Sequence, residues 1–451
     1  MLGFLGNVLM RELRTIDDLF DAVVPKDHQH SGNLTTLGNA RSELEVTRIL
    51  NEIASQNTSF DPASSFAGAG FYHRVIPAAV REIVWRGEWT TPYTPYQPEV
   101  SQGILATLFD FQSLMATLSG MKAVNAGLYH GANALVEGAL MACRLTKRDK
   151  IIVSDAVNPV AIRNLETYFK PKGLELVRAK TKNGVTEPGS VEELVDEKTA
   201  AVIVQNPNVW GLIDGMDGQA VAAHSKGALY IVYGGGDQVS LGSLLPPADY
   251  GADVYAAEGQ HFGVPTGFGG PHVGVLGIAD ERNVRQLPGR LVLQAQDING
   301  KRAWRLGLQT REQHIRRESA TSNTCTSESL IAVMSAVYLA VMGKHGFSEA
   351  SSQSYHVAHY LAKEVSQIPG FELLHPGQLF FNEFAVRTPQ PAHEIVNMLA
   401  GQGILAGVPV ARAFPYASLD GNVLLVAATE ANNSKAHLDR FIGGLREHGR
   451  Q

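Results

Sequence analysis

The stretch GADVYAAEGQHFGVPTGFGGPHVGVL spans residues 251–276 and decides how the rest of the sequence is interpreted. It predicts a short strand at 252–257, a loop rich in glycine and proline, and a second strand at 273–278. Gly263, Gly267, Gly269 and Gly270 give the loop the backbone freedom that a tight turn or a close approach to a ligand requires. A hairpin without chemistry would show the same pattern, so the rest of the chain has to decide between the two interpretations.

Lysine is missing from the part of the chain around this loop, between Lys226 and Lys301. A pocket formed here for an aldehyde cofactor would therefore lack the amine that holds such a cofactor. His261 is the one titratable residue that we associate with these glycines. We expect it to be a hydrogen-bonding loop residue and not a catalytic base.

Composition points to a compact protein of two domains with a small N-terminal extension. The chain has 451 residues, of which 44% are hydrophobic and 18% are charged. A net charge of −6 without any basic run argues against nucleic acid as a partner. Cys143 and Cys325 form no CxxC pair or metal-ligand spacing, so we expect two reduced, buried thiols and no metal site.

The N-terminal decapeptide MLGFLGNVLM is apolar but short, and no basic residue precedes it. Asp17 and Asp18, which follow, argue against a transit peptide. No segment is long enough to suggest a membrane span. These observations predict a soluble, cytoplasmic protein without a membrane partner.

Helices and strands alternate between residues 101 and 272, which predicts a mainly parallel sheet with helices on both faces. The expected helices lie at 104–119 and 132–144 and around Ile162, and the expected strands at 123–125, 150–154, 174–179, 200–204 and 228–233. Residues 190–193, Ser-Val-Glu-Glu, have the spacing of a helix capping box.

Three regions follow from these patterns. Residues 1–100 form an N-terminal helical arm, with helices expected at 11–24 and 42–54, and a loop rich in proline and tyrosine. Residues 101–330 form the large α/β domain. Residues 331–451 form a small α+β domain with helices and strands in a different order. An alternative for the arm is that its helices pack on their own domain.

The proline- and tyrosine-rich loop has the sequence WTTPYTPYQPEVSQG at residues 89–103. Prolines at every third position, Pro92, Pro95 and Pro98, forbid a helix and favour a stiff, extended path. A stiff backbone can present side chains at a low entropic cost. We therefore predict a binding role for the polar and aromatic residues between the prolines, which are Tyr93, Thr94, Tyr96, Gln97 and Glu99.

A polar segment follows at residues 301–328 and includes QTREQHIRRESATSNTCTSE. Mixed charges of this kind usually form a solvated helix face. The hydroxyl-rich run that follows the arginines offers another interpretation, because guanidinium groups and hydroxyls together bind anions. The candidates for phosphate or carboxylate contacts are Arg311, Thr321, Ser322 and Asn323.

Five of these motifs together resemble the P-protein of the glycine cleavage system, in particular the first (alpha) subunit of its two-chain form. The matching segments are TPYTPYQPEVSQG at 91–103, QNPNVWG at 205–211, EGQHFGVPTGFGGPHVG at 258–274, REQHIRRESATSNTCT at 311–326 and FNEFAV at 381–386. They run from the arm to the C-terminal domain, so the resemblance covers nearly the whole chain. Tyr72 is followed here by His73 and Arg74, where the family usually has an acidic residue and then histidine.

The resemblance implies the fold of the aspartate-aminotransferase-like, fold type I pyridoxal-phosphate enzymes. In this alignment Gln260 takes the place of the lysine that forms the Schiff base, and a carboxamide cannot form an imine. Asp237 takes the place of the aspartate that faces the pyridine nitrogen of the cofactor. Without the lysine, we expect Asp237 to be a structural cap and the pocket around Asp237, Gln260 and His261 to be degenerate.

The resemblance also implies the reaction and the partners. Subunit 2 would carry the pyridoxal phosphate, the assembly would be an α2β2 heterotetramer, and no cofactor would be bound covalently in this chain. The complex would decarboxylate glycine and pass the aminomethyl group to the lipoyl arm of the H-protein. This chain would supply no catalytic residue of its own but would complete the partner's site through the proline- and tyrosine-rich loop.

Two other functions remain open from the sequence alone. The chain could be a self-sufficient pyridoxal-phosphate enzyme that uses another lysine, Lys226 or Lys301. It could also be a purely structural subunit, with no residue near the chemistry.

Overall fold

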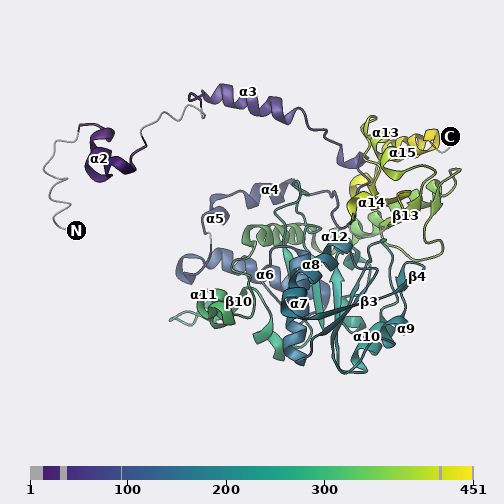
Figure 1. The fold of residues 1–451 in the computed structure, drawn as a ribbon, viewed down its shortest axis with the longest axis horizontal. Coiled ribbons are helices and arrows are strands. Elements are labelled where there is room, and N and C mark those ends of the chain that lie inside the picture. The colour runs from purple at the N-terminus through teal and green to yellow at the C-terminus, as the bar shows by residue number, and fades with distance from the viewer. Residues whose placement is uncertain (1–13, 31–37, 93, 416–418, 449–451) are drawn as a thin grey trace. The chain divides into compact units, whose positions relative to one another are not determined.

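The computed structural model describes residues 14–30, 38–92, 94–415 and 419–448 (Figure 1). The chain forms two compact units, residues 1–59 and residues 60–451. The predicted division into three domains stays a prediction. Within the second unit, however, Phe66 belongs to the core of the C-terminal part and stacks on Phe441 with ring centroids 4.2 Å apart, whereas Val80 and Val84 belong to the core of the large sheet.

The first unit consists of two capped helices, α2 (Ile16–Val23) and α3 (Glu43–Ala54), at the positions predicted for the arm. Each begins with a capping box, formed by Thr15 and Asp18 in α2 and by Ser42 and Glu45 in α3. No residue of either helix is buried, although both helices carry an apolar stripe. Hydrogen bonds at the helix ends, rather than a hydrophobic core, therefore define these helices.

The second unit is built on a seven-stranded sheet in the order β1-β9-β8-β7-β6-β2-β3. Strands β2, β3, β6, β7 and β8 are parallel, while β9 runs antiparallel to both β8 and β1. The strands are β1 (Ala123–Val124), β2 (Lys150–Ser154), β3 (Glu175–Ala179), β6 (Thr199–Gln205), β7 (Leu229–Gly234), β8 (Val254–Glu258) and β9 (Gly274–Ile278).

Helices cover both faces of this sheet, as predicted (Figure 1). Side chains alternate between the two cores, so that Val202 and Val204 of β6 face one core and Ile203 faces the other. One core includes residues of α6 (Gln102–Ser119), α10 (Asp217–His224) and α12 (Ser329–Val365), and the other includes residues of α7 (Gly131–Thr146) and α8 (Pro159–Phe169).

The C-terminal part forms a four-stranded antiparallel sheet in the order β12-β13-β15-β14. Its strands are β12 (Glu372–Leu373), β13 (Glu383–Arg387), β14 (Val408–Pro409) and β15 (Val423–Ala427), with helices α13 (Ala392–Ala400), α14 (Val410–Ala413) and α15 (Lys435–His448). The predicted α+β character of this part is correct.

Helix α12 connects the two parts and is 37 residues long. It is long and apolar enough to meet the criteria for a membrane span, which the sequence patterns did not indicate. Half of its most apolar window is buried, it packs against α6 and α4 (Ala78–Val84), and Gly343 interrupts it with φ +57°. These contacts make α12 a core helix of this unit.

Several local features differ from the predictions. The capping box predicted at 190–193 is wrong, because Ser190 lies inside α9 (Pro188–Glu192) and its hydroxyl donates to the Glu187 carbonyl at 2.8 Å. Cys325 is exposed and Cys143 half-buried, so the prediction of two buried thiols is also wrong. Two hairpins were not predicted, β4 (Thr181–Lys182) with β5 (Val185–Thr186) and β10 (Leu291–Gln296) with β11 (Arg302–Gly307). The structure also contains the short helices α5 (Gly87–Thr90) and α11 (Gln313–Arg316).

Phe66 and Phe268 provide a matched test of this core. Phe66 has no exposed surface, whereas Phe268 is fully exposed on the glycine-rich loop. We expect Phe66→Ala to lower the free energy of unfolding by about 3–5 kcal/mol, because it leaves a cavity beside Phe441. Phe268→Ala should change it by less than about 0.5 kcal/mol. Denaturant unfolding of both variants measures the difference, and equal effects would contradict the assigned core.

Candidate functional site

Asp237 lies just beyond the carboxyl end of β7, the usual position of a ligand site in an open α/β sheet. Its carboxylate is completely buried and forms an ion pair with Arg74, which also pairs with Glu430. Asn382 donates to the same carboxylate at 2.6 Å, and the backbone N–H of Val239 donates to Oδ1 at 3.0 Å. Asp237 therefore caps the 3-10 turn that follows it, as predicted, and is already neutralised by a side chain of its own protein.

Gln260 lies two residues after β8 and is 1% exposed. Its carboxamide accepts from the N–H of Tyr72 at 3.0 Å and donates to the carbonyls of Tyr72, at 3.0 Å, and Val264, at 2.7 Å. Two of these bonds pair Gln260 with the backbone of Tyr72, in the segment before α4, and the third closes its own loop at Val264. The side chain thus has a structural role, with both amide hydrogens and its oxygen engaged.

His261 is buried and holds the same segment. Its Nδ1 accepts from the N–H of Gln238 at 3.2 Å, so Nε2 carries the hydrogen and donates to the Gly70 carbonyl at 2.9 Å. Burial lowers the pKa of His261 to about 4. A neutral imidazole with both nitrogens engaged matches the predicted hydrogen-bonding role and does not suit a catalytic base.

Glu258, the last residue of β8, places its carboxyl group at the N-terminus of α7. Its oxygens accept from the N–H of Gly131 at 2.9 Å and of Gln260 at 3.0 Å. A helix N-terminus is a natural anion site, because its first N–H groups have no partner within the helix. Burial raises the pKa of Glu258 to about 7. The protein's own carboxyl group therefore fills this anion site.

Glu383 is a second buried acid, at the start of β13. Its oxygens accept from the N–H of Ala69 at 2.6 Å and from the hydroxyl of Tyr72 at 2.9 Å. Burial raises the pKa of Glu383 to about 7, and the charge of Asp237 adds to this effect. Glu383 thus attaches the segment 68–74 to the small sheet.

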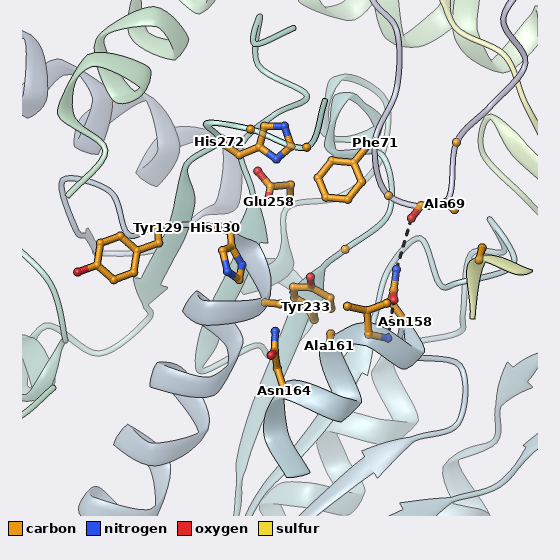
Figure 2. Close-up of a pocket in the computed structure, with 18 of the residues that line it drawn as sticks. Ala69, Phe71, Tyr129, His130, Asn158, Ala161, Asn164, Tyr233, Glu258 and His272 are labelled. Atoms are coloured by element: carbon orange, nitrogen blue, oxygen red, sulfur yellow. Dashed lines mark hydrogen bonds between the residues drawn. The ribbon is translucent and has the colours of Figure 1, made fainter. Parts of the chain in front are cut away.

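An open cavity of about 600 Å³ lies beside these residues (Figure 2). It is bounded by the segment 68–71, the first turns of α7 and α8, the ends of β7 and β8, the glycine-rich loop and α14. Its polar lining residues are Tyr129, His130, Asn158, Asn164, Tyr233, Glu258, His272 and Glu328. Phe71 stacks on His272, with ring centroids 4.9 Å apart, and forms one wall.

The proline- and tyrosine-rich loop lies elsewhere, against the β10–β11 hairpin. Gln102, at the start of α6, donates to the carbonyls of Pro98 at 2.6 Å and Trp304 at 2.8 Å, which joins the loop to β11. Tyr96 accepts from Arg290 at 2.8 Å, and the guanidinium also lies over the Tyr96 ring, 4.8 Å from its centroid. Thr94 is half-buried, Gln97 and Glu99 are exposed, and Tyr93 lies outside the described residues.

Arg290 connects this loop with the second predicted group. A pocket scarcely larger than one water molecule is lined by Gly289, Arg290, Arg311, Glu312, Thr321, Ser322, Thr324 and Thr326. The Arg311 guanidinium donates to the carbonyls of Leu287 and, at 2.8 Å, Gly289. Arg311, Thr321 and Ser322 therefore do come together, whereas Asn323 is exposed and does not line this pocket. Anion binding by this group stays a prediction.

Comparison with known proteins gives the family. The family model for the glycine cleavage system P-protein matches residues 7–435. A probable glycine dehydrogenase (decarboxylating) subunit 1 of Rhodospirillum centenum is 44% identical over 405 residues, which are 90% of this chain and 89% of that protein. A protein of the same name from Thermomicrobium roseum is 42% identical over 412 residues, 90% of each chain.

The chain belongs to the glycine cleavage system P-protein family. A crystal structure of a glycine decarboxylase (P-protein) in inhibitor-bound form is 38% identical, with a TM-score of 0.86 over 96% of this chain and 95% of that chain. Glutamate decarboxylase of Lactobacillus brevis, at 13% identity and a TM-score of 0.67 over 94% of this chain and 95% of that one, shares the fold alone. The predicted family and fold class are confirmed, and the predicted enzyme class matches the names that these relatives carry.

The residues of this pocket do not fit pyridoxal phosphate. Gln260 carries a carboxamide, which cannot form an imine with the cofactor, and none of the described residues that line the cavity is a lysine. The α7 N-terminus, where a phosphate would be expected, already holds Glu258. Asp237, whose charge would stabilise a protonated ring nitrogen, already pairs with Arg74. The pocket therefore lacks an amine, and Glu258 and Arg74 occupy the places where a phosphate and a ring nitrogen would bind.

Sequence analysis missed several residues that shape this site. Glu258 and His272 lie in the same stretch, residues 251–276, so the prediction that His261 is the one titratable residue near these glycines is wrong. Phe262 is buried, whereas Phe268 points to solvent. Arg74 was visible only as a departure from the family pattern, because its partners Asp237 and Glu430 lie 163 and 356 positions away in the sequence.

The raised pKa of Glu383 predicts a pH effect on stability. The folded pKa, about 7, lies above the ordinary value of 4.5, so this group stabilises the fold below about pH 4.5 and loses that contribution as the pH rises to 7. The loss reaches at most about 1.4 kcal/mol per pH unit. The unfolding free energy of Glu383→Gln should therefore fall less steeply between pH 5 and 7 than that of the wild type.

Urea unfolding at several pH values measures this slope. Glu447→Gln, at an exposed position of α15, serves as the control and should run parallel to the wild type. A Glu383→Gln profile that also ran parallel to the wild type would contradict the assignment.

Restoring the lysine should not restore a cofactor site. Gln260→Lys removes the hydrogen bonds to Tyr72 and Val264 and places an amine at a buried position. We expect the free energy of unfolding to fall by about 2–4 kcal/mol. No visible absorbance of a lysine-bound cofactor should appear when pyridoxal phosphate is added, because Glu258 and Arg74 still hold their positions. Such an absorbance with full stability would contradict the filled pocket.

Proposed function

We propose that this chain is the cofactor-free subunit of a two-chain P-protein. Together with subunit 2, which carries the pyridoxal phosphate, it decarboxylates glycine and passes the aminomethyl group to the lipoyl arm of the H-protein. The assembly is α2β2 and cytoplasmic. The names of the relatives, each a subunit 1 of glycine dehydrogenase (decarboxylating), support the division of labour between two chains.

The observation that carries this proposal is the self-filled pocket. Glu258 occupies the anion site at the N-terminus of α7, and Arg74 neutralises the buried Asp237. Gln260, at the position that the family resemblance gives to the Schiff-base lysine, is hydrogen-bonded to the backbone. A chain built in this way needs no cofactor to complete its interior. The amine for the chemistry then has to come from another chain.

Within the complex, the loop around Tyr96 contributes to the partner's site. Tyr96 is 46% exposed although its hydroxyl and ring are both fixed by Arg290, so the side chain has a set orientation and a free surface. Glu99 is exposed on the same loop. Positioning of this kind matters for catalysis, because a misplacement of an ångström can reduce the rate about a hundredfold.

The alternative of a self-sufficient enzyme would need Lys226 or Lys301. Lys226 pairs with Glu197 at 3.0 Å on the surface, and Lys301 is exposed next to the turn of the β10–β11 hairpin. Neither residue lines the cavity. A purely structural role remains the other alternative, and the loop substitutions below separate it from the proposal.

The test is reconstitution with subunit 2. We expect the isolated chain to release no labelled carbon dioxide from glycine and to show no bound pyridoxal phosphate, whereas the co-purified complex, given lipoylated H-protein, does release it. Tyr96→Phe and Glu99→Gln should each lower kcat of the complex without changing its assembly. Turnover by the isolated chain would refute the cofactor-free role.

Unchanged turnover by both loop variants, with the complex intact, would remove the loop from the mechanism and leave the structural role. Tyr355→Phe, which removes a hydroxyl from the surface of α12, is the matched control for Tyr96→Phe.

A further inference from the structure

The cavity next to the filled pocket has unused hydrogen-bonding capacity. Tyr233 is only 5% exposed and lines the cavity, yet its hydroxyl has no hydrogen-bond partner among the described residues. Burial and the nearby Glu258 raise the pKa of Tyr233, which keeps the hydroxyl protonated. Because Tyr233 lines the cavity, its hydroxyl is available as a donor to an acceptor atom of a ligand that lies there.

His130 supplies a second donor. Its Nδ1 accepts from the N–H of Asn133 at 3.2 Å, so the neutral ring carries its hydrogen on Nε2. Burial lowers the pKa of His130, which favours this neutral form. Asn164 adds a side-chain amide with no partner among the described residues, and Figure 2 shows it at the same cavity as His130 and Tyr233.

The charges around the cavity favour an uncharged ligand. None of its described lining residues is a lysine or arginine that could pair with an anion, and the acids among them are Glu258 and Glu328. Burial raises the pKa of Glu258 to about 7 and also raises the pKa of Glu328, which reduces the negative charge available to an ammonium ion. The walls are mostly apolar and include Phe71, Val160, Val408 and Phe414.

We propose that this cavity binds an uncharged amide on an apolar chain, with the carbonyl accepting from Tyr233 and His130 and the N–H donating to Asn164. The apolar chain lies along Phe71 and the walls near α8 and α14. Tyr233 and His130 each donate a hydrogen bond, and the Asn164 side chain can both donate and accept one. An amide has both a carbonyl oxygen and an N–H for these groups, whereas an ether or an ester has no N–H to donate. This ligand class is distinct from pyridoxal phosphate, which is anionic.

Two sources could supply such an amide: a free small molecule, or an acylated lysine carried by another protein. Only the second source rests on the proposed function, since a lipoylated lysine is an uncharged secondary amide on an aliphatic chain. In that case the cavity holds the arm between its visits to the cofactor site of subunit 2.

A headgroup series tests the ligand class on the full-length chain. The probes N-methylhexanamide, hexanoate and hexylammonium have chains of similar length and differ in charge and hydrogen bonding. We expect saturation-transfer NMR titrations to show binding of the amide, with hexanoate and hexylammonium at least about tenfold weaker. Equal binding of all three probes would overturn the proposal, because it would reflect apolar partitioning alone.

A hydroxyl deletion tests the assigned contact. Tyr233→Phe keeps the buried ring and removes one donor, so the Kd of N-methylhexanamide should rise about tenfold, which corresponds to about 1.4 kcal/mol. Tyr355→Phe, away from the cavity, should leave the Kd unchanged. Loss of binding in both variants, or in neither, would overturn the assignment, and thermal unfolding of each variant verifies that it is folded.

Competition in the complex with subunit 2 identifies the source. Displacement of the amide probe by lipoylated but not by unlipoylated H-protein supports the tethered arm, whereas displacement by neither assigns a free amide. Displacement by unlipoylated H-protein would overturn the amide assignment. If the two chains fail to assemble, the proposed function is refuted, but the amide probe should still bind to the isolated chain. Failure of the proposed function can therefore be distinguished from failure of the amide site.

Discussion

The buried ion pair between Arg74 and Asp237 is the interaction on which the interior of this protein depends. Both side chains are at most 1% exposed, and Glu430 provides the second counter-charge for the guanidinium. A buried charge without a partner is strongly destabilising, so each of these residues requires the others. The pair connects the segment before α4 with the end of β7 and with the C-terminal part, and it thereby sets the geometry around the cavity.

Hydrogen bonds of the same segment extend this constraint. Gln260 and His261 hold the backbone of Tyr72 and Gly70, and Glu383 holds Ala69 and the Tyr72 hydroxyl. The segment 68–74 is therefore attached to the ends of β7 and β8 and to β13 by side chains of this chain. The polar groups of Asp237, Gln260 and His261 are directed to the protein itself, which makes this region internally complete.

Much of the fold could be predicted from local patterns, because buried parallel strands are apolar runs flanked by glycine and polar turns. Strand β2 has the predicted bounds, and β7 and β8 differ by only one or two residues. The β10–β11 hairpin was missed because only its first residues, Leu-Val-Leu, are an apolar run and the remainder of both strands is mostly polar. Gln102 and Gln112 of α6 bond to its strands, and these contacts exist only in the folded chain. The Arg74 network could not be predicted either, because its partners meet only in the folded chain.

The cavity keeps a defined shape because its surroundings are held by the chain's own side chains. Glu258 accepts from the first N–H of α7, so this helix N-terminus needs no bound anion. This carboxyl group does not remove the space beyond, which is still bounded by Phe71, Tyr233 and the glycine-rich loop. Burial raises the pKa of Glu258 to about 7, so this carboxyl group is only partly ionised near neutral pH, and no described lining residue is a lysine or arginine. The remaining space therefore favours uncharged ligands.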